Sequence, residues 1–177
     1  TLAVDGAGVQ GTQLTTSLKD LQKLGVDAVN LSSLSGDDFG LSLGGTLGEL
    51  NTTGLGLPQF DPDLNISLDI PLGTTTDANG NLVTSSTPFS EIDSIVNPAT
   101  DVAQQLADAG IDRLNIAGDA DVSYQIDSAG AQNLITAGLG FASDDTITLA
   151  VDDAGVQGTQ LTTSLKDLQK LGEDAVN

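Results

Sequence analysis

The side chains best suited to chemistry in this sequence are aspartates that gather in short, turn-like segments. Oxygen ligands on loop tips suit a hard cation such as Ca²⁺. Two acidic turns occupy corresponding places along the chain, and a third segment carries Asp and Asn at alternate positions around Gly80, which resembles the first half of a calcium loop. The candidate metal ligands are Asp37, Asp38, Asp119, Asp121, Asp77, Asn79 and Asn81.

A purely structural role explains the same residues. Aspartate favours turns and helix N-termini, where its carboxylate accepts hydrogen bonds from backbone N–H groups. The Asn79-Gly80 pair is a strong signal for a hairpin turn. A complete EF-hand loop would also need a glutamate well downstream of Asp77, and the sequence has none there. Both interpretations, a calcium site and a solvated turn, stay open at this point.

The residue types that carry most catalytic chemistry are missing. The sequence contains no His, Cys, Met or Trp, so no imidazole could activate a serine or threonine. The glycine-rich stretches Gly44-Gly45 and Gly54–Gly56 lack the lysine of a phosphate-binding loop. Paired carboxylates could in principle hydrolyse a glycoside, but the chain has only one Tyr and four Phe to line a sugar cleft. We therefore predict a protein that is not an enzyme.

The charge balance excludes several partners. There are 25 acidic and 5 basic residues, giving a net charge of −20, and all but three of the acidic residues are aspartates. A field of this sign repels nucleic acid and anionic lipid. No apolar stretch approaches the roughly 18 residues of a membrane span. Carboxylates at this density need screening by salt or divalent cations, which favours a secreted protein in an extracellular or cell-surface setting.

A long repeat is the most informative feature of the chain. Residues 148–177 repeat residues 1–30 with two differences, Asp153 in place of Gly6 and Glu173 in place of Val26. The equivalent residues Thr1 and Thr148 are 147 positions apart. Such a period indicates a tandem array, of which this chain is a piece. The predicted partners are neighbouring repeats or other copies of the chain itself.

A weaker repeat lies inside the longer one. Residues 21–33 align with residues 106–118, and residues 65–70 align with residues 146–151. The first unit is about 23 residues longer than the second, and the additional residues fall between Pro71 and Pro98. The predicted organisation is a repeat unit A at 1–70, an inserted hairpin or loop at 71–98, a repeat unit B at 99–151, and the start of the next unit A at 152–177.

Both units have the same predicted order of elements, β-α-β-β-α-β. Apolar residues at three-to-four spacing predict the helices, and alternating apolar residues predict the strands. Each pair of strands joined by an acidic turn is predicted to form a hairpin. The fold class is therefore α/β (α+β), built as split-βαβ modules or as an α/β solenoid. The helices are predicted at 14–24, 46–53, 101–109 and 128–137, and the strands at 28–32, 39–43, 65–70, 113–117, 122–126 and 146–151.

The recurring phrases of the two units resemble those of a known class of proteins. A helix ends in Leu-Gly-Val-Asp or Ala-Gly-Ile-Asp within residues 21–27 and 106–112, and a second helix ends in Ala-Gly-Leu-Gly-Phe before the acidic pair at 144–145. These phrases are similar to the tandem α/β repeat regions of large surface adhesins of Gram-negative bacteria, which are type I-secreted, RTX-like and calcium-rich. The glycine-rich nonapeptide of the calcium-binding repeat proper is absent from this sequence.

Two functions follow as expectations. The first is a structural repeat segment of an extracellular adhesin, fibre or biofilm-matrix protein, non-catalytic and able to assemble with itself into filaments. The alternative is a calcium-dependent module that binds a surface receptor or glycan, with the segment between Pro71 and Pro98 as the contact. The predicted cofactor is Ca²⁺.

Overall fold

The structure is a computed structural model of the 177-residue chain. It describes residues 1–6, 8–32, 34, 38–50, 54–71, 74–76, 82–84, 89–117, 123–151, 156–157, 160–161, 164–172 and 175–176.

The largest element is a six-stranded sheet in the order β11-β9-β6-β5-β3-β2. Every neighbouring pair is parallel except β2 and β3. The mixed α/β class predicted from the sequence is therefore confirmed, with a mostly parallel sheet. The strands are β2 (Val9–Gln10), β3 (Gln13–Leu14), β5 (Asp38–Ser42), β6 (Asn65–Pro71), β9 (Arg113–Ala117) and β11 (Gly140–Phe141).

Four smaller sheets complete the strand pairing of the described residues. One is a parallel sheet of three strands in the order β10-β12-β15, and another is the parallel pair of β1 with β4. Two antiparallel pairs join β7 to β8 and β13 to β14. These strands are β1 (Leu2–Ala3), β4 (Val29–Asn30), β7 (Thr74–Thr76), β8 (Leu82–Thr84), β10 (Ser123–Asp127), β12 (Thr146–Ala150), β13 (Val156–Gln157), β14 (Gln160–Leu161) and β15 (Ala175–Val176).

The hairpins predicted at the acidic turns are wrong. Strands β4 and β5 follow each other in sequence, but β4 pairs with β1 while β5 pairs with β6. Likewise β9 pairs with β6, whereas β10 pairs with β12. Because parallel strands cannot be joined by a two-residue turn, each pairing must instead use a longer crossover. The apolar alternation indicates where strands lie, but it does not specify the partner strand.

Five α-helices and one 3₁₀ turn lie among the described residues. Ser17 and Ser164 cap the equivalent helices α1 and α5, and Asp127 caps α4, each by accepting a backbone N–H. Of the helix predicted at 46–53 the structure describes residues 46–50, and these form a 3₁₀ turn, η1, rather than an α-helix. Helix α2 is not among the predicted helices. The helices are α1 (Leu18–Lys23), α2 (Ser90–Val96), α3 (Val102–Asp108), α4 (Ser128–Ala137) and α5 (Leu165–Leu171), with η1 at Leu47–Glu49.

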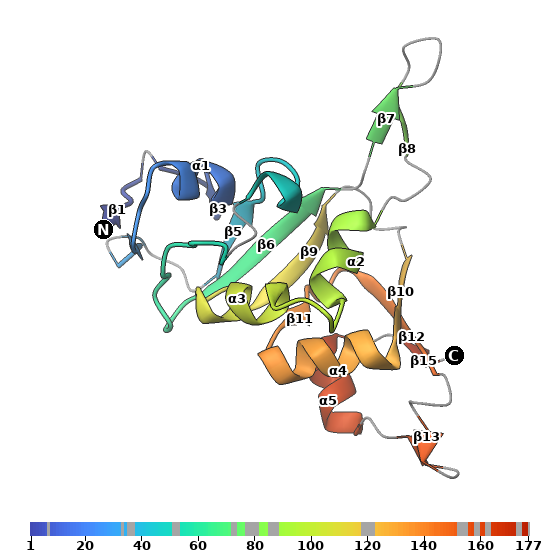
Figure 1. The fold of residues 1–177 in the computed structure, drawn as a ribbon. Coiled ribbons are helices and arrows are strands. Elements are labelled where there is room, and N and C mark those ends of the chain that lie inside the picture. The colour runs from blue at the N-terminus through green and yellow to red at the C-terminus, as the bar shows by residue number, and fades with distance from the viewer. Residues whose placement is uncertain are drawn as a thin grey trace.

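The segment predicted as an insert contributes two different elements. Strands β7 and β8 pair with each other and project away from the rest of the chain (Figure 1). Helix α2 packs against α3, α4 and β6, where Ile92 and Ile95 are fully buried. The end of this segment nearest α3 therefore belongs to the core.

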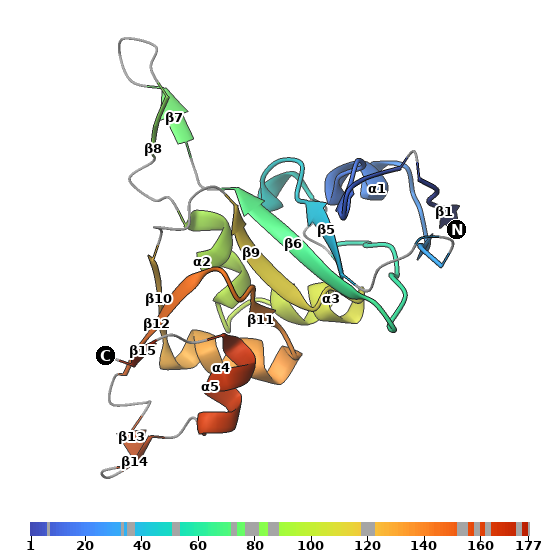
Figure 2. The ribbon, with the colours of Figure 1, turned by 180° about the vertical axis from the view of Figure 1, so that it is seen from behind.

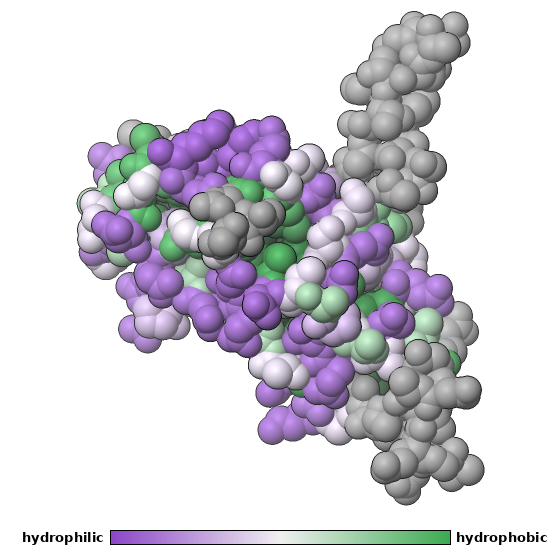
Figure 3. All heavy atoms as spheres, viewed as in Figure 1, coloured by the Kyte–Doolittle hydropathy of each residue, from purple (hydrophilic) through white to green (hydrophobic). Residues whose placement is uncertain are grey.

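The core lies between the helices and one face of the parallel strands. Ile66, Leu68 and Ile70 of β6 point to this side and are almost completely buried. Helices α2 and α3 are drawn in front of β9 in Figure 1, and Figure 2 shows the strands from behind. Hydrophilic side chains cover most of the outer surface of α1 and α3 (Figure 3). The buried side chains form one continuous cluster that runs from Val4 to Leu171.

The two copies of the long repeat have the same strand register. Leu2 lies opposite Val29, and their equivalents Leu149 and Val176 lie opposite each other in the same way. The antiparallel pairs β2–β3 and β13–β14 also correspond residue by residue. The copies differ in burial at the ends of α1 and α5, where Leu24 is 67% exposed and its equivalent Leu171 is 0% exposed.

This difference predicts unequal costs for the same substitution. Leu171→Ala should lower the free energy of unfolding by about 2–5 kcal/mol, because it leaves a cavity among buried side chains. Leu24→Ala, in a nearly identical sequence, should change it by no more than about 0.5 kcal/mol. Urea unfolding followed by circular dichroism measures both. Equal losses for the two variants would contradict the packing of α5.

Candidate functional site

Of the seven predicted metal ligands, only Asp38 lies among the described residues. Asp38 is exposed at the start of β5, and its Oδ1 accepts a hydrogen bond of 2.9 Å from Nδ2 of Asn65 on β6. The other predicted ligands lie outside the described residues, namely Asp37, Asp77, Asn79, Asn81, Asp119 and Asp121. Within the described part of the chain, no group of three or more His, Cys, Asp or Glu is placed to hold a metal ion.

Asp38 belongs to a polar face on the side of the sheet opposite the core. On β5, β6 and β9 the residues that alternate with the buried ones are small or polar. They border a depression of about 470 Å³. We call this surface the polar sheet face and define it by Asp38, Gly40, Asn65, Ser67, Asp69, Arg113 and Asn115.

The strand register determines which of these side chains are neighbours. Ser67 on β6 lies between Gly40 on β5 and Arg113 on β9. One step further along the strands, Asp69 lies beside Asn115, whose Nδ2 donates a 2.7 Å hydrogen bond to Oδ1 of Asp69. On this face, amide and guanidinium groups that donate hydrogen bonds thus lie next to carboxylates that accept them.

Sequence reasoning missed this face because it needs the order of the strands. The alternation in residues 65–70 and 113–117 already separates apolar from polar positions. Predicting that Asp69 meets Asn115 requires the parallel pairing of β6 with β9, which are separated by more than forty residues of chain. No local signal supplies that pairing.

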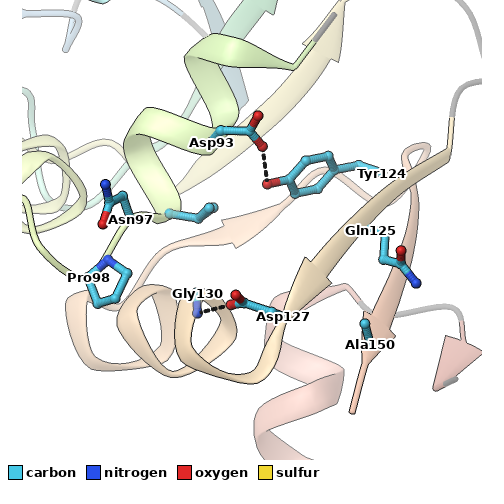
Figure 4. A pocket seen from close by; sticks show the side chains of 9 residues that line it. Asp93, Asn97, Pro98, Tyr124, Gln125, Asp127, Gly130 and Ala150 are labelled. Atoms are coloured by element: carbon cyan, nitrogen blue, oxygen red, sulfur yellow. Dashed lines mark hydrogen bonds between the residues drawn. The ribbon is translucent and has the colours of Figure 1, made fainter. Parts of the chain in front are cut away.

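A second depression, of about 370 Å³, lies between the end of α2 and the start of α4 (Figure 4). Tyr124 on β10 points toward α2, and its hydroxyl donates a 3.0 Å hydrogen bond to Oδ1 of Asp93. The Tyr124 ring also packs edge-on against Phe89 with centroids 5.1 Å apart. Burial, followed by the hydrogen bond to Asp93, raises the pKa of Tyr124 well above its usual value. The phenol therefore remains protonated and links β10 to α2.

The other carboxylate of this depression also has a local partner. Oδ1 of Asp127 accepts a 2.7 Å hydrogen bond from the backbone N–H of Gly130, at the first turn of α4 (Figure 4). This is the geometry of a helix N-cap. Both carboxylates of the depression, Asp93 and Asp127, thus accept hydrogen bonds that hold neighbouring elements together.

Several other aspartates hold strands in place. Oδ2 of Asp112 accepts a 2.8 Å hydrogen bond from the backbone N–H of Ile66, which begins the buried part of β6. Asp145 does the same for the backbone N–H of Ile116 on β9, at 3.1 and 3.0 Å from its two oxygens. Ile66 lies one residue before the first pair of β6 with β9, and Ile116 lies two residues after the last pair of β9 with β11. Each carboxylate therefore satisfies a backbone donor just beyond the end of a strand pairing.

Comparisons with known proteins identify no relative of this chain. No family model, no curated protein and no solved structure matches it. Among the described residues, no helix is long and apolar enough to cross a membrane.

The role of Asp112 can be tested against its equivalent in the first unit, Asp27. Asp112→Ala leaves the N–H of Ile66 without its acceptor and should lower the free energy of unfolding by about 1–3 kcal/mol. Asp112→Asn keeps a carbonyl acceptor and should lose less. Asp27 is exposed, so Asp27→Ala should cost no more than about 0.5 kcal/mol. Chemical denaturation of the three variants measures this, and a loss as large for Asp27→Ala as for Asp112→Ala would refute the assignment.

Proposed function

We propose that this chain is a structural repeat segment of an extracellular adhesin, fibre or biofilm-matrix protein. The observation that carries the proposal is the recurrence of one strand register, Leu2 opposite Val29 and Leu149 opposite Val176. A nearly identical stretch of sequence thus forms the same βαβ crossover at both ends of the chain. A protein that gains length by adding copies requires such a reproducible unit.

The way the units meet supports a solenoid rather than separate modules. A module that closes on itself would pair its strands within one unit. Instead β6, in the first unit, pairs along five residues with β9, in the second. Strand β12 in turn pairs with β10 on one edge and with β15, in the next copy, on the other. Strand pairing between units would then give the array a continuous sheet and, beneath it, a continuous core.

An extracellular location is part of the same proposal. A net charge of −20 on 177 residues needs screening by a saline medium or by divalent cations. The resemblance of the repeat phrases to those of secreted bacterial adhesins agrees with this setting. An antibody raised against the chain should label intact, unpermeabilised cells or their surrounding matrix. Labelling that appears only after the cells are permeabilised would contradict the location.

The array function predicts growth in length by equal steps. Chains with one, two or three additional copies of residues 1–147 joined before Thr1 should show a maximum dimension that rises linearly in small-angle X-ray scattering. Because like charges also extend a flexible chain, the series should be repeated at about 1 M salt, where the Debye length falls to about 3 Å. Linear growth that persists in high salt supports a rigid array. Growth that collapses in high salt would rule it out.

Calcium-dependent ligand binding is the second candidate, and the polar sheet face favours it. Its amides, hydroxyl, guanidinium and carboxylates can hydrogen-bond the hydroxyl groups of a glycan. Asp38 and Asp69 would accept from these groups, and Arg113 would donate to them. Asp38 also adjoins the predicted ligand Asp37, so an ion bound at the acidic turn would lie next to this face.

This candidate makes a separate prediction. With calcium, the melting temperature should rise above that with a chelator, and magnesium at the same ionic strength should not reproduce the rise. Binding on a glycan array should require calcium and be lost in Asp69→Ala. The exposed Asp108→Ala variant, on α3, serves as the control of equal charge. Identical melting temperatures with calcium, magnesium and chelator would rule out this candidate. The aspartates would then keep only their role as acceptors of hydrogen bonds from backbone N–H groups.

A further inference from the structure

Leu24 is the large hydrophobic side chain that the described part of the chain leaves exposed. It follows directly after α1, and Gly25 comes next with a φ of 63°. In the second copy of the long repeat the same two residues are Leu171 and Gly172. Within the shorter repeat they correspond to Ala109 and Gly110, at the end of α3. The chain therefore contains three versions of this helix end.

Two of the three versions are covered by the preceding unit. Leu171 and Ala109 are 0% and 1% exposed. A side-chain carbon at Gly172 would lie 3.3 Å from the carbonyl oxygen of Phe141, and one at Gly110 would lie 3.2 Å from that of Phe60. Each helix end thus packs closely on the backbone of a phenylalanine earlier in the chain. At Gly25, no atom lies within 4 Å of the corresponding position.

Two elements of the preceding unit cover helix α5. Helix α5 packs against α4 and against β11, which contains Gly140 and Phe141. Gly140 approaches the backbone carbonyl of Lys170 so closely that a side chain there would collide with it. This contact explains a glycine at position 140, since the helix end and the strand touch through their backbones.

One edge of strand β1 has no partner strand among the described strands. Its equivalent in the second copy, β12, has β15 on one side and β10 on the other, with Ile126 opposite Leu149. Among the described strands, β1 pairs only with β4. Leu2 is accordingly half-buried, whereas Leu149 is fully buried. Backbone and side chain thus both lack the neighbours that their equivalents have.

We propose that Leu2, Leu24 and Gly25 form a docking surface for another copy of residues 123–147 of this same repeat. The incoming copy would place its β10 along β1, with Ile126 beside Leu2, and its α4 and β11 over Leu24 and Gly25. This inference rests on the repeat function proposed above and identifies the contact through which copies join. The surface is not a general apolar patch, because each of its residues is identical in the copy at 148–177, where the interface is already formed.

A cysteine probe tests the docking surface directly, because the chain contains no cysteine. Leu24→Cys is made in the 177-residue chain and in a chain with one more copy of residues 1–147 joined before Thr1. The rate at which the thiol reacts with a maleimide is measured for both under native conditions. The rate should fall on the order of 100-fold in the extended chain, because a buried thiol reacts only when the interface opens.

Lys23→Cys is the matched control, since both Lys23 and its equivalent Lys170 are exposed. Its thiol should react at the same rate in both chains. A second measurement needs no substitution. The N–H groups of Leu2 and Val4 already donate to the carbonyls of Ala28 and Asn30, so the N–H of Ala3 faces the other edge of β1. Hydrogen exchange of the Ala3 amide should therefore slow in the extended chain, where β1 gains a partner strand on that edge. Equal rates for Leu24→Cys in the two chains, or unchanged exchange, would overturn the proposal.

Failure of this inference is distinguishable from failure of the proposed function. If scattering shows linear growth in high salt while the Leu24→Cys thiol stays reactive, copies form an array without this contact, and only the docking surface is refuted. If the thiol is protected but the maximum dimension does not grow with copy number, the contact exists and the extended array is refuted.

Discussion

The parallel pairing of β6 with β5 on one edge and with β9 on the other is the interaction on which the rest of the structure depends. Parallel neighbours require crossover connections. The connection from β6 to β9 carries α2 and α3, and the described part of the connection from β5 to β6 carries the 3₁₀ turn η1. The buried side chains of Ile66, Leu68 and Ile70 therefore contact elements from both units. Polar residues remain for the opposite face, and the polar sheet face is a direct result of this one-sided covering.

The aspartates have two different physical roles that composition alone cannot separate. Asp112, Asp127 and Asp145 each accept a hydrogen bond from a backbone N–H at the start or edge of an element. Each of these bonds offsets the cost of burying an N–H group without a partner. Asp38, in contrast, is exposed and bonds only to a neighbouring side chain among the contacts described. Its carboxylate therefore remains accessible to an external ligand.

Sequence reasoning recovered the elements far better than their pairing. The helix at 128–137 and the strand at 113–117 were predicted with the bounds that the structure has, because capping residues and apolar periodicity are local signals. The hairpins were wrong because strand partners depend on residues distant in sequence. Helix α2 is not predicted, although Ile92, Ile95 and Val96 have helical spacing, because the alignment of the two units assigns residues 71–98 to an inserted hairpin or loop. The polar sheet face could not be predicted for the same reason as the strand pairing.

The close approach of Gly172 to Phe141, and of Gly110 to Phe60, has a consequence for stoichiometry. Both contacts join unlike surfaces, the end of a helix and the backbone of a phenylalanine earlier in the chain, and such head-to-tail contacts extend into an open array unless the rotation between units closes a ring. Every added copy would cover one such helix end and bring another acceptor of the same kind. Nothing in the geometry counts copies, so termination would need a chemically different end unit with a polar outer surface.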